Sequence, residues 1–588
     1  FQAEDGIRDC LLSRGLGDVY KRQRLRILNE DLKKQLIKII GSKYLLISDW
    51  GKKPFLDGWR YGSGKALAVV KPGNLMELWQ VLNFCVEHDL IIIMQAANTG
   101  LTGGSTPYGN DYDRDILIIN TLRINKINII NGGEEILAHA GSTLYDLEKK
   151  LSPLKREPHS VIGSTSIGAS IVGGICNNSG GSLVKRGPAY TEMSLYVKIN
   201  KMGKLVMVND LDIDLGKNPI EIINNLENEN FEKKDFKKSK KVSSNENYEK
   251  LVRDVESEKP ARFNADINLL SGASGSAGKV AVFAVRLKTY PSSKKNQVFY
   301  VGSNQPNTFW KIRRDVLKNF KYLPVSGDYM HKDCYDAAKK YSKDTFIVLE
   351  KLGTKFLPTL FEMKRKVDLL SKMFYFLPSN LSDKMMQFLS IFWPNHLPKR
   401  IEEFRKKFDH HWIIEMSDEG IDEARDYFKH FFNRSEGDFF ECSDKEGKKA
   451  ILHRYTAASA FGRYSKIFEH KIGGQMSMDI AFPRNEKKWF EELPADLDKK
   501  FELKFYYGHL FCHVLHQNYI IKKGYDQESI KKKMFEIYDK RGAEYPSEHN
   551  VGHEYVAKTD LLNFYKELDP TNTFNPGIGL SSKNKFWK

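Results

Sequence analysis

The feature that most constrains the fold is a glycine-rich loop that directly follows a strongly apolar run. Residues 90–97 read LIIIMQAA, and the chain continues as NTGLTGGS to Ser105. Glycine reaches backbone conformations that other residues avoid, so such loops often only reverse the chain. A loop poor in side chains also lets backbone N–H groups surround a phosphate. It is neither a Walker loop nor a G-x-G-x-x-G dinucleotide turn, and by itself it leaves both a plain turn and a phosphate site open.

A second glycine cluster occupies residues 163–187, in the segment GSTSIGASIVGGICNNSGGSLVKRG. Two clusters in one domain indicate two walls of one elongated, phosphate-bearing ligand site. Around them, apolar runs typical of strands alternate with helical periodicity, which predicts an α+β domain. Asn74 is the predicted N-cap of one helix. Strands are predicted within 66–73, 90–96, 115–121, 136–142 and 278–290, and helices within 74–89 and 143–154.

The length of 588 residues exceeds what one core usually supports, so we expect two or three domains. Residues 1–23 resemble translated adapter read-through, and we expect the native sequence to begin near Arg24. Residues 225–260 are polar, low in complexity and mixed in charge, which predicts a surface excursion without chemistry. The run QVFYVGSN, from Gln297, is expected to open a further domain.

Composition limits the cellular setting and the binding partners that we expect for this protein. The cysteines after Cys10 form no C-x-x-C pair and no signal peptide is evident, which favours reduced thiols in a cytosolic setting. No apolar run reaches the ~18–20 residues that span a bilayer, so we expect a soluble or peripheral protein. The net charge of +17 indicates nucleic acid, an anionic membrane or a general solubility effect.

Four segments together carry a family resemblance: KPGNLMELWQVLNFCVEHDL, MQAANTGLTGGS, SVIGSTSIGASIVGGICNNSGG and GKVAVFAVRL. Their order is similar to the FAD-binding domain of the vanillyl-alcohol oxidase (PCMH) type of flavoprotein. From about residue 24 onward the chain more closely resembles the bacterial quinone-dependent D-lactate dehydrogenases, down to the strings GNDYDRD, REPHSVIG, RGPAYTEMSL and PSEHNVGH. The resemblance implies an α+β fold with an FAD-binding domain, an α+β cap domain and a helical, basic membrane-contact insert.

The resemblance also assigns the glycine-rich loops. In the family the first loop wraps the FAD pyrophosphate with backbone amides, and the second cluster and a late strand complete the site. Two linked phosphates need several N–H donors, and only segments poor in side chains bring the backbone close enough. The implied FAD contacts are Ala96, Ala97, Asn98, Thr99, Gly100, Gly104, Ser105, Gly163, Ser170, Gly180 and Val282.

The segment YPSEHNVGHEY holds the predicted acid–base chemistry, with Glu548, His549 and His553 close together. It resembles the Glu-His-Gly-Ile-Gly string of FAD-linked hydroxyacid dehydrogenases, with Asn550 in place of the first glycine. The resemblance implies that His549 removes the hydroxyl proton as hydride leaves the adjacent carbon. An imidazole, whose ordinary pKa is ~6.5, suits that task near neutral pH. The alternative is a hydrogen-bonded histidine in a turn, with His553 or His516 as the base.

The segment YYGHLFCHVLHQ carries three more histidines, His509, His513 and His516. Relatives have His-x-Gly-Asp-x-Asn-x-His, whose end histidines are also seven residues apart, and there both histidines and the later glutamate can hold a divalent metal. The resemblance therefore implies a metal site of His509, His516 and Glu548, which is a sound Lewis-acid set. On a helix, the same spacing would serve only packing and hydrogen bonding, and both interpretations stay open.

A 2-hydroxy acid needs a partner for its carboxylate, and arginine offers a bidentate fork. LHRYTAASAFGRY followed by MDIAFPRN resembles the relatives' segment with a substrate-binding arginine. The resemblance implies that Arg454 has this role, with Arg463 and Arg484 as alternatives.

Residues 331–407 combine an excess of Lys and Arg with Phe, Trp, Met and Leu. One interpretation is a helical subdomain with a solvated basic face. The favoured one is a membrane contact, with apolar side chains in the headgroup boundary and cations against anionic phospholipid. Nucleic acid is disfavoured because no reading motif accompanies the charge. The expected lipid contacts are Phe374, Phe376, Phe392 and Trp393, with Lys364, Arg365 and Lys366 as the basic cluster.

The predicted function is an FAD-dependent enzyme that oxidises D-lactate to pyruvate and passes the electrons to membrane quinone. We expect it at the cytoplasmic face of the bacterial inner membrane. The alternatives are an FAD enzyme for another 2-hydroxy acid and a flavin-binding membrane protein without catalysis. The predicted domains are FAD-binding at 24–288 and 540–588, cap at 289–330 and 408–539, and membrane-contact insert at 331–407.

Overall fold

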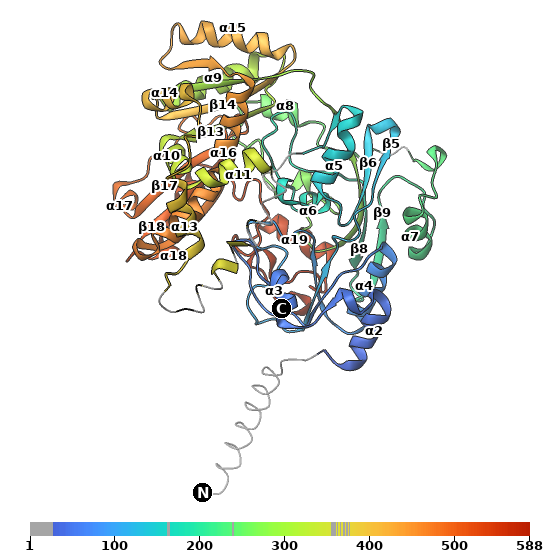
Figure 1. Cartoon of the computed structure of the whole chain (residues 1–588). Coiled ribbons are helices and arrows are strands. Elements are labelled where there is room, and N and C mark those ends of the chain that lie inside the picture. The colour runs from blue at the N-terminus through green and yellow to red at the C-terminus, as the bar shows by residue number, and fades with distance from the viewer. Residues whose placement is uncertain are drawn as a thin grey trace, which may run out of the picture.

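The fold is described from a computed structural model of the chain (Figure 1). The structure describes residues 28–160, 165–237, 240–353 and 377–588, and residues 360, 363, 364, 366–368, 371 and 374. The predicted leader at 1–23 and the predicted FAD contact Gly163 lie outside the described residues, as do Arg365 and Phe376 of the insert.

A four-stranded sheet forms where the first apolar runs predict strands. Its order is β1-β2-β4-β3, with β2, β4 and β3 parallel and β1 antiparallel at the edge. Helix α4 (Leu75–Glu87) joins β2 to β3, and the Asn74 side chain caps it by accepting from the Glu77 N–H at 2.7 Å. The predicted strands, helix and N-cap are confirmed. The bounds are β1 (Leu45–Leu46), β2 (Ala68–Val70), β3 (Ile91–Gln95) and β4 (Ile116–Asn120), with α2 (Glu30–Ile40) and α3 (Asp49–Leu56) nearby.

A five-stranded antiparallel sheet follows, in the order β5-β6-β10-β8-β9. Helix α5 (Leu144–Leu151) and the short α6 (Ile171–Cys176) pack their apolar side chains against this sheet. The first glycine loop leaves the end of β3, and the second surrounds α6, so the two sheets present both loops. The bounds are β5 (Ile127–Ile130), β6 (Glu135–His139), β8 (Ser194–Ile199), β9 (Leu205–Asn209) and β10 (Ala281–Lys288), with β7 (Arg156–Glu157) paired to β11 (Tyr290–Pro291).

The prediction that residues 225–260 form only a surface excursion is wrong. After α7 (Pro219–Glu227), this segment contains α8 (Tyr248–Arg253), whose Tyr248 and Val252 are fully buried in a hydrophobic core. A six-residue helix with two inward side chains is too short to show a period against so many neighbouring charges.

A seven-stranded antiparallel sheet forms the other half of the molecule, in the order β15-β12-β14-β13-β17-β18-β16. Figure 1 shows it beside the first two sheets, with α15 and α9 at its outer end. The strands are β12 (Asn296–Ser303), β13 (Ser326–His331), β14 (His410–Ser417), β15 (Asp438–Glu441), β16 (Ile472–Ala481), β17 (Phe501–His509) and β18 (Val514–Lys522).

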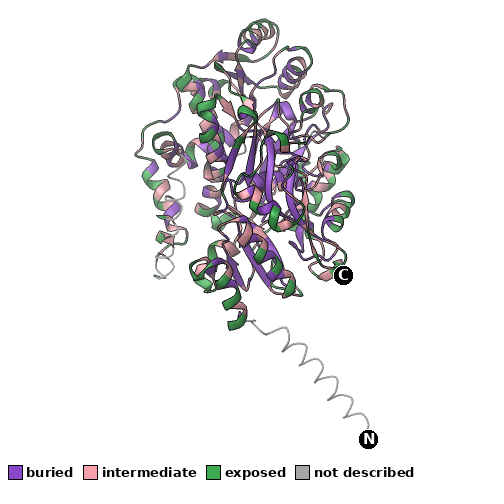
Figure 2. Cartoon of the chain, turned by 90° about the vertical axis from the view of Figure 1, so that its right-hand side faces the viewer, coloured by how far each residue is buried: buried purple, intermediate pink, exposed green. Residues whose placement is uncertain are grey.

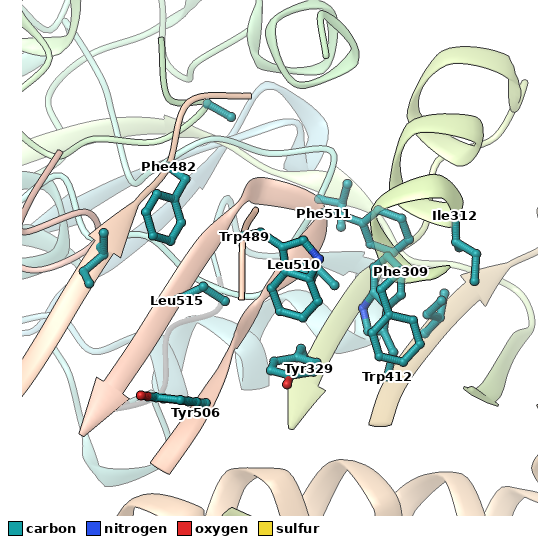
Figure 3. Close-up of a cluster of buried hydrophobic side chains, with 14 of the residues drawn as sticks. Phe309, Ile312, Tyr329, Trp412, Phe482, Trp489, Tyr506, Leu510, Phe511 and Leu515 are labelled. Carbon is teal, nitrogen blue, oxygen red and sulfur yellow. The ribbon is translucent and has the colours of Figure 1, made fainter. Parts of the chain in front are cut away.

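Helices cover both faces of this sheet. One face packs against α9 (Pro306–Asn319), α15 (Gly420–Phe432) and α18 (Gln527–Lys540) through an aromatic cluster that includes Phe309, Trp412 and Phe511 (Figure 3). The other face packs against α10 (Lys332–Tyr341), α14 (Lys399–Lys407) and α16 (Asp444–Ile467). Figure 2 shows the resulting pattern, with buried strands inside and exposed outer faces on the helices.

The described part of the insert is helical, as predicted. It adds α11 (Lys343–Leu352) and α13 (Leu381–Ser390) to α10 and α14. Among the described residues, no helix has both the length and the apolar character needed to cross a bilayer. Near the end of the chain, after α17 (Ala495–Asp498) and α19 (Thr559–Leu568), the Ile92 N–H donates to the Thr573 carbonyl at 2.9 Å. The last residues thus return to the first sheet, and the predicted domain boundaries stay predictions.

Candidate functional site

One cavity of about 1480 Å³ lies between the glycine-rich loops and the seven-stranded sheet. Typical small-molecule pockets measure ~300–1000 Å³, so this cavity can hold more than one ligand. Every predicted FAD and metal-site residue that the structure describes lines it, as do His549 and Arg454. These residues are Ala96, Ala97, Asn98, Thr99, Gly100, Gly104, Ser105, Ser170, Gly180, Val282, Arg454, His509, His516, Glu548 and His549.

The first loop presents a run of backbone donors to the cavity. From Ala97 to Ser105, no backbone N–H donates a hydrogen bond to any described residue. The Asn98 side chain fixes the loop, because its amide donates to the Asp57 carbonyl and accepts from the Ser105 hydroxyl, both at 2.9 Å. A Cβ at Gly100 would meet no atom within 4 Å, which marks open space. A loop with unpaired N–H groups beside open space fits a diphosphate.

The second loop connects the cofactor side of the cavity to the segment with the predicted base. The Gly180 N–H donates to the Glu548 carbonyl at 3.2 Å. A Cβ at Gly180 would lie 2.5 Å from the Glu548 side chain, so only glycine permits this approach. The Ser170 hydroxyl accepts from the Gly173 N–H at 3.0 Å and caps the N-terminus of α6.

His549 forms a tight pair with Asp479 of β16, a residue that no sequence pattern predicted. The Asp479 Oδ2 lies 2.6 Å from His549 Nδ1, and it also accepts from the backbone N–H groups of Glu548 and His549 at 2.8 and 3.1 Å. The Ser547 hydroxyl donates to the other oxygen, Oδ1, at 2.7 Å. These bonds fix the imidazole with Nδ1 toward the carboxylate. Among the described residues nothing bonds to its Nε2, so Nε2 is available on the cavity side.

The pKa values of this pair follow from burial and mutual charge. Burial lowers the pKa of His549, but the adjacent Asp479 carboxylate outweighs burial and raises the pKa above its ordinary value. Burial would raise the pKa of Asp479, but the charges of His549 and His516 and their hydrogen bonds hold it well below its usual range. Asp479 is therefore ionised, and the arrangement resembles the histidine–carboxylate pairs that orient a general base.

His509, His516 and Glu548 present three ligand atoms to one point. The reactive atoms of all three residues lie within 4.8 Å of one another. The Glu548 Oε2 is 3.5 Å from His509 Nε2 and 3.6 Å from His516 Nε2. On the other side of each ring, Nδ1 faces a carboxylate, Asp328 at 3.0 Å and Asp479 at 3.2 Å. Metal-binding histidines usually have this carboxylate support.

The helical interpretation of this histidine segment is wrong. His509 ends β17, His516 lies within β18, and a tight turn with His513 in the left-handed region joins them. The hairpin brings the rings of His509 and His516 to 5.2 Å between centroids. His513 points elsewhere: its Nδ1 lies 2.8 Å from the Pro483 carbonyl in the core.

The three candidate arginines have different surroundings. Arg454 lines the cavity from α16, 3.5 Å from Asp328 and over the ring of Tyr507. Arg463 also lines it, but is bound to Asp344 and Asp383 at 2.7 and 2.9 Å. Arg484 does not reach the cavity, because its guanidinium binds the Lys259 carbonyl and the Ser257 hydroxyl.

The structure also shows where His553 and Arg262 lie relative to the site. The alternative base His553 is directed away from the cavity, with Nε2 3.0 Å from the Thr106 carbonyl and its ring stacked on Tyr108. Arg262, which the sequence patterns also did not predict, pairs with Glu548 Oε1 at 2.5 Å, and the two side chains are 1% and 4% exposed. This pairing fixes the carboxylate and leaves Oε2 toward the two histidines. A lone aspartate in the apolar run QMSMDIAF was the available signal for Asp479; Arg262 had none.

Comparisons with known proteins agree in both halves of the chain. Residues 66–205 match the family described as "FAD binding domain", and residues 298–587 match "D-lactate dehydrogenase, membrane binding". The quinone-dependent D-lactate dehydrogenase of Haemophilus influenzae is 52% identical over 559 residues, 95% of this chain and 99% of that protein. The Escherichia coli protein of the same name is 50% identical over 95% of this chain and 98% of its own.

Among solved structures, p-cresol methylhydroxylase with bound substrate superposes with a TM-score of 0.57 at 12% identity, over 94% of this chain and 97% of that one. At this identity the similarity concerns the fold alone. It agrees with the predicted PCMH-type architecture.

Proposed function

The chain belongs to the family of quinone-dependent D-lactate dehydrogenases, and we propose that it oxidises D-lactate to pyruvate with FAD and delivers the electrons to quinone as a peripheral membrane enzyme. One observation carries this proposal. The loop with unpaired N–H groups and His549, which is paired with Asp479, line the same cavity. A flavin-binding protein without catalysis would not need a histidine oriented by an ionised carboxylate beside its cofactor loop.

FAD fits the cavity by the chemistry of its walls. The N–H groups of residues 97–105 would hold the pyrophosphate, and the side-chain-poor second loop would let the cofactor lie close to the backbone. When bound, FAD accepts the hydride that leaves the hydroxyl-bearing carbon of the substrate.

The residues of the chain supply the remaining steps. Arg454 binds the substrate carboxylate as a guanidinium fork. His549 Nε2 takes the hydroxyl proton, while Asp479 holds the other ring nitrogen and stabilises the imidazolium that forms. Because the Asp479 carboxylate raises the pKa of His549, the imidazole is a stronger base than a free one.

The first test follows the colour of the bound flavin. Purified protein is expected to be yellow and to bleach on anaerobic addition of D-lactate, while L-lactate leaves it oxidised. A panel of other D-2-hydroxy acids gives the substrate range from the same readout. A protein that cannot be loaded with FAD would overturn the assignment. Bleaching by another hydroxy acid but not by D-lactate would overturn only the substrate.

We also propose that His509, His516 and Glu548 bind a divalent metal that polarises the substrate hydroxyl. Exhaustive chelation is expected to abolish flavin reduction, and Zn²⁺ or Mn²⁺ to restore it. His509→Ala is expected to lose most of the metal measured by elemental analysis, whereas His470→Ala, an exposed histidine outside the cavity, is not. Full turnover by metal-free protein would refute the site.

We further propose that the insert contacts anionic phospholipid. Lys364 of the predicted basic cluster is bound to Asp383 at 2.6 Å, whereas Phe392 is 72% exposed and Phe388 60%. The wild type is expected to sediment with anionic liposomes and to keep a salt-resistant fraction, because buried apolar surface is not screened. Phe388→Ser/Phe392→Ser should lose this fraction, whereas Ile220→Ser, exposed on α7, should retain it. Equal sedimentation of the double variant would contradict the proposal.

A further inference from the structure

The cavity continues beyond the predicted lactate site along one face of α16. Its lining includes Ile451, Arg454, Ser459, Gly462 and Lys466, which are spaced by three to five residues and so share one side of a helix. At 1.5 Å per residue, the twelve residues from Arg454 to Lys466 span about 18 Å. We call the part of the cavity along residues 455–466 the α16 arm. The arm extends from the proposed lactate site, beside Arg454, toward the insert.

The far end of the α16 arm is walled by the insert. Thr345 and Leu349 of α11 and Asp383 of α13 line it opposite α16. Asp383 accepts from Arg463 at 2.9 Å and from Lys364 at 2.6 Å, and Lys466 lies 3.1 Å from its other oxygen. These ion pairs hold the helices around the arm and place cationic N–H donors on its wall.

The opposite side of α13 carries apolar side chains into solvent. Met385, Phe388 and Leu389 of α13 and Phe392, two residues beyond its end, follow the spacing i, i+3, i+4 and i+7, and their exposed fractions are 44%, 60%, 45% and 72%. Soluble proteins rarely expose so many contiguous large apolar side chains, and a stripe of this kind is typical of helices that lie in a lipid interface. The same short helix thus bounds the α16 arm on one side and meets the proposed membrane on the other.

We propose that the α16 arm is the quinone site, which the quinone enters from the lipid beside α13. The proposal rests on the proposed function. A quinone is a flat dione with an apolar tail: the carbonyl oxygens accept hydrogen bonds from cationic donors such as Lys466, and the tail follows the apolar stripe into lipid. The electrons and protons balance without another reactant. Lactate loses two electrons and two protons as its C–OH becomes C=O, and the quinone gains two of each to become the quinol.

Gly462 provides a direct test, because it lines the arm from near the C-terminal end of α16 and a Cβ there would meet no atom within 4 Å. The first atom of a side chain at this position therefore displaces no neighbour, and a phenyl ring on it would occupy the arm. Gly462→Phe is compared with Lys448→Phe, which places the same ring on an exposed position of the same helix outside the cavity. Two rates are measured by flavin absorbance: anaerobic reduction by D-lactate, and reoxidation of photoreduced protein by a short-chain ubiquinone in anionic liposomes.

Gly462→Phe is expected to slow reoxidation by the quinone at least tenfold, while its reduction by D-lactate stays within twofold of wild type. Lys448→Phe is expected to match wild type in both rates. Reoxidation of Gly462→Phe at the wild-type rate would overturn the inference. Photoreduction makes the quinone test independent of lactate: a wild type that ignores D-lactate but is reoxidised by quinone refutes the proposed substrate and leaves the α16 arm testable.

Discussion

His549→Ala is expected to retain bound FAD and to lose flavin reduction by D-lactate by roughly 10²–10⁴-fold, the usual scale for loss of a general base. The variant keeps the glycine-rich loops, so its flavin spectrum serves as the folding control. The measurement is anaerobic stopped-flow bleaching at saturating D-lactate. His553→Ala is the matched variant, because His553 is a buried histidine four residues away that does not line the cavity. If the flavin of His549→Ala is bleached at the wild-type rate, His549 is not the general base.

Asp479→Asn tests whether Asp479 acts on the base His549 through its charge or only supports the fold. The asparagine can still accept hydrogen bonds from the backbone, but it carries no charge. The Asp479 carboxylate is what raises the pKa of His549 against burial, so the variant should have a lower His549 pKa. Since the base must be unprotonated, activity rises with pH through this pKa. The acidic limb of the pH–rate profile is therefore expected to move to lower pH, whereas a purely structural role would lower the rate at every pH.

The parts of the site that the sequence predicted are those encoded in local patterns. The first loop directly follows β3, and the order of apolar run and glycines is visible within a dozen residues. The Gly180 contact is also glycine-specific, but its reason is a long-range approach of Glu548 that no local pattern reveals.

The residues that the sequence did not reveal act across the sheet and between distant segments. Asp479 reaches His549 from 70 residues away, and Arg262 reaches Glu548 from 286 residues away. The hairpin of His509 and His516 was hidden for a related reason. Two histidines seven residues apart suit two helical turns, but a tight turn between them places them on neighbouring strands, where the ladder pairs Tyr507 with His516.

Arg262→Met is expected to lower the free energy of unfolding by about 3–5 kcal/mol, which is the usual loss when one partner of a buried ion pair is removed. The substitution removes the Arg262 hydrogen bonds to the Leu183 and Arg186 carbonyls as well as the pair with Glu548. It leaves the Glu548 carboxylate buried without its cation. Urea unfolding followed by tryptophan fluorescence measures the loss, with bound FAD held at one saturation in all variants.

Arg405→Met is the matched control, because Arg405 forms a bidentate pair with Asp336 at the surface and should cost no more than about 1 kcal/mol. Adding Glu548→Gln to Arg262→Met should recover part of the stability, since it removes the unpaired buried charge. The double variant should still fail to reduce flavin, because Oε2 of Glu548 is one of the three proposed metal ligands. If Arg262→Met is no less stable than Arg405→Met, Glu548 does not depend on Arg262 as an ionised partner, and the glutamate must be held by the histidines or by the metal they bind.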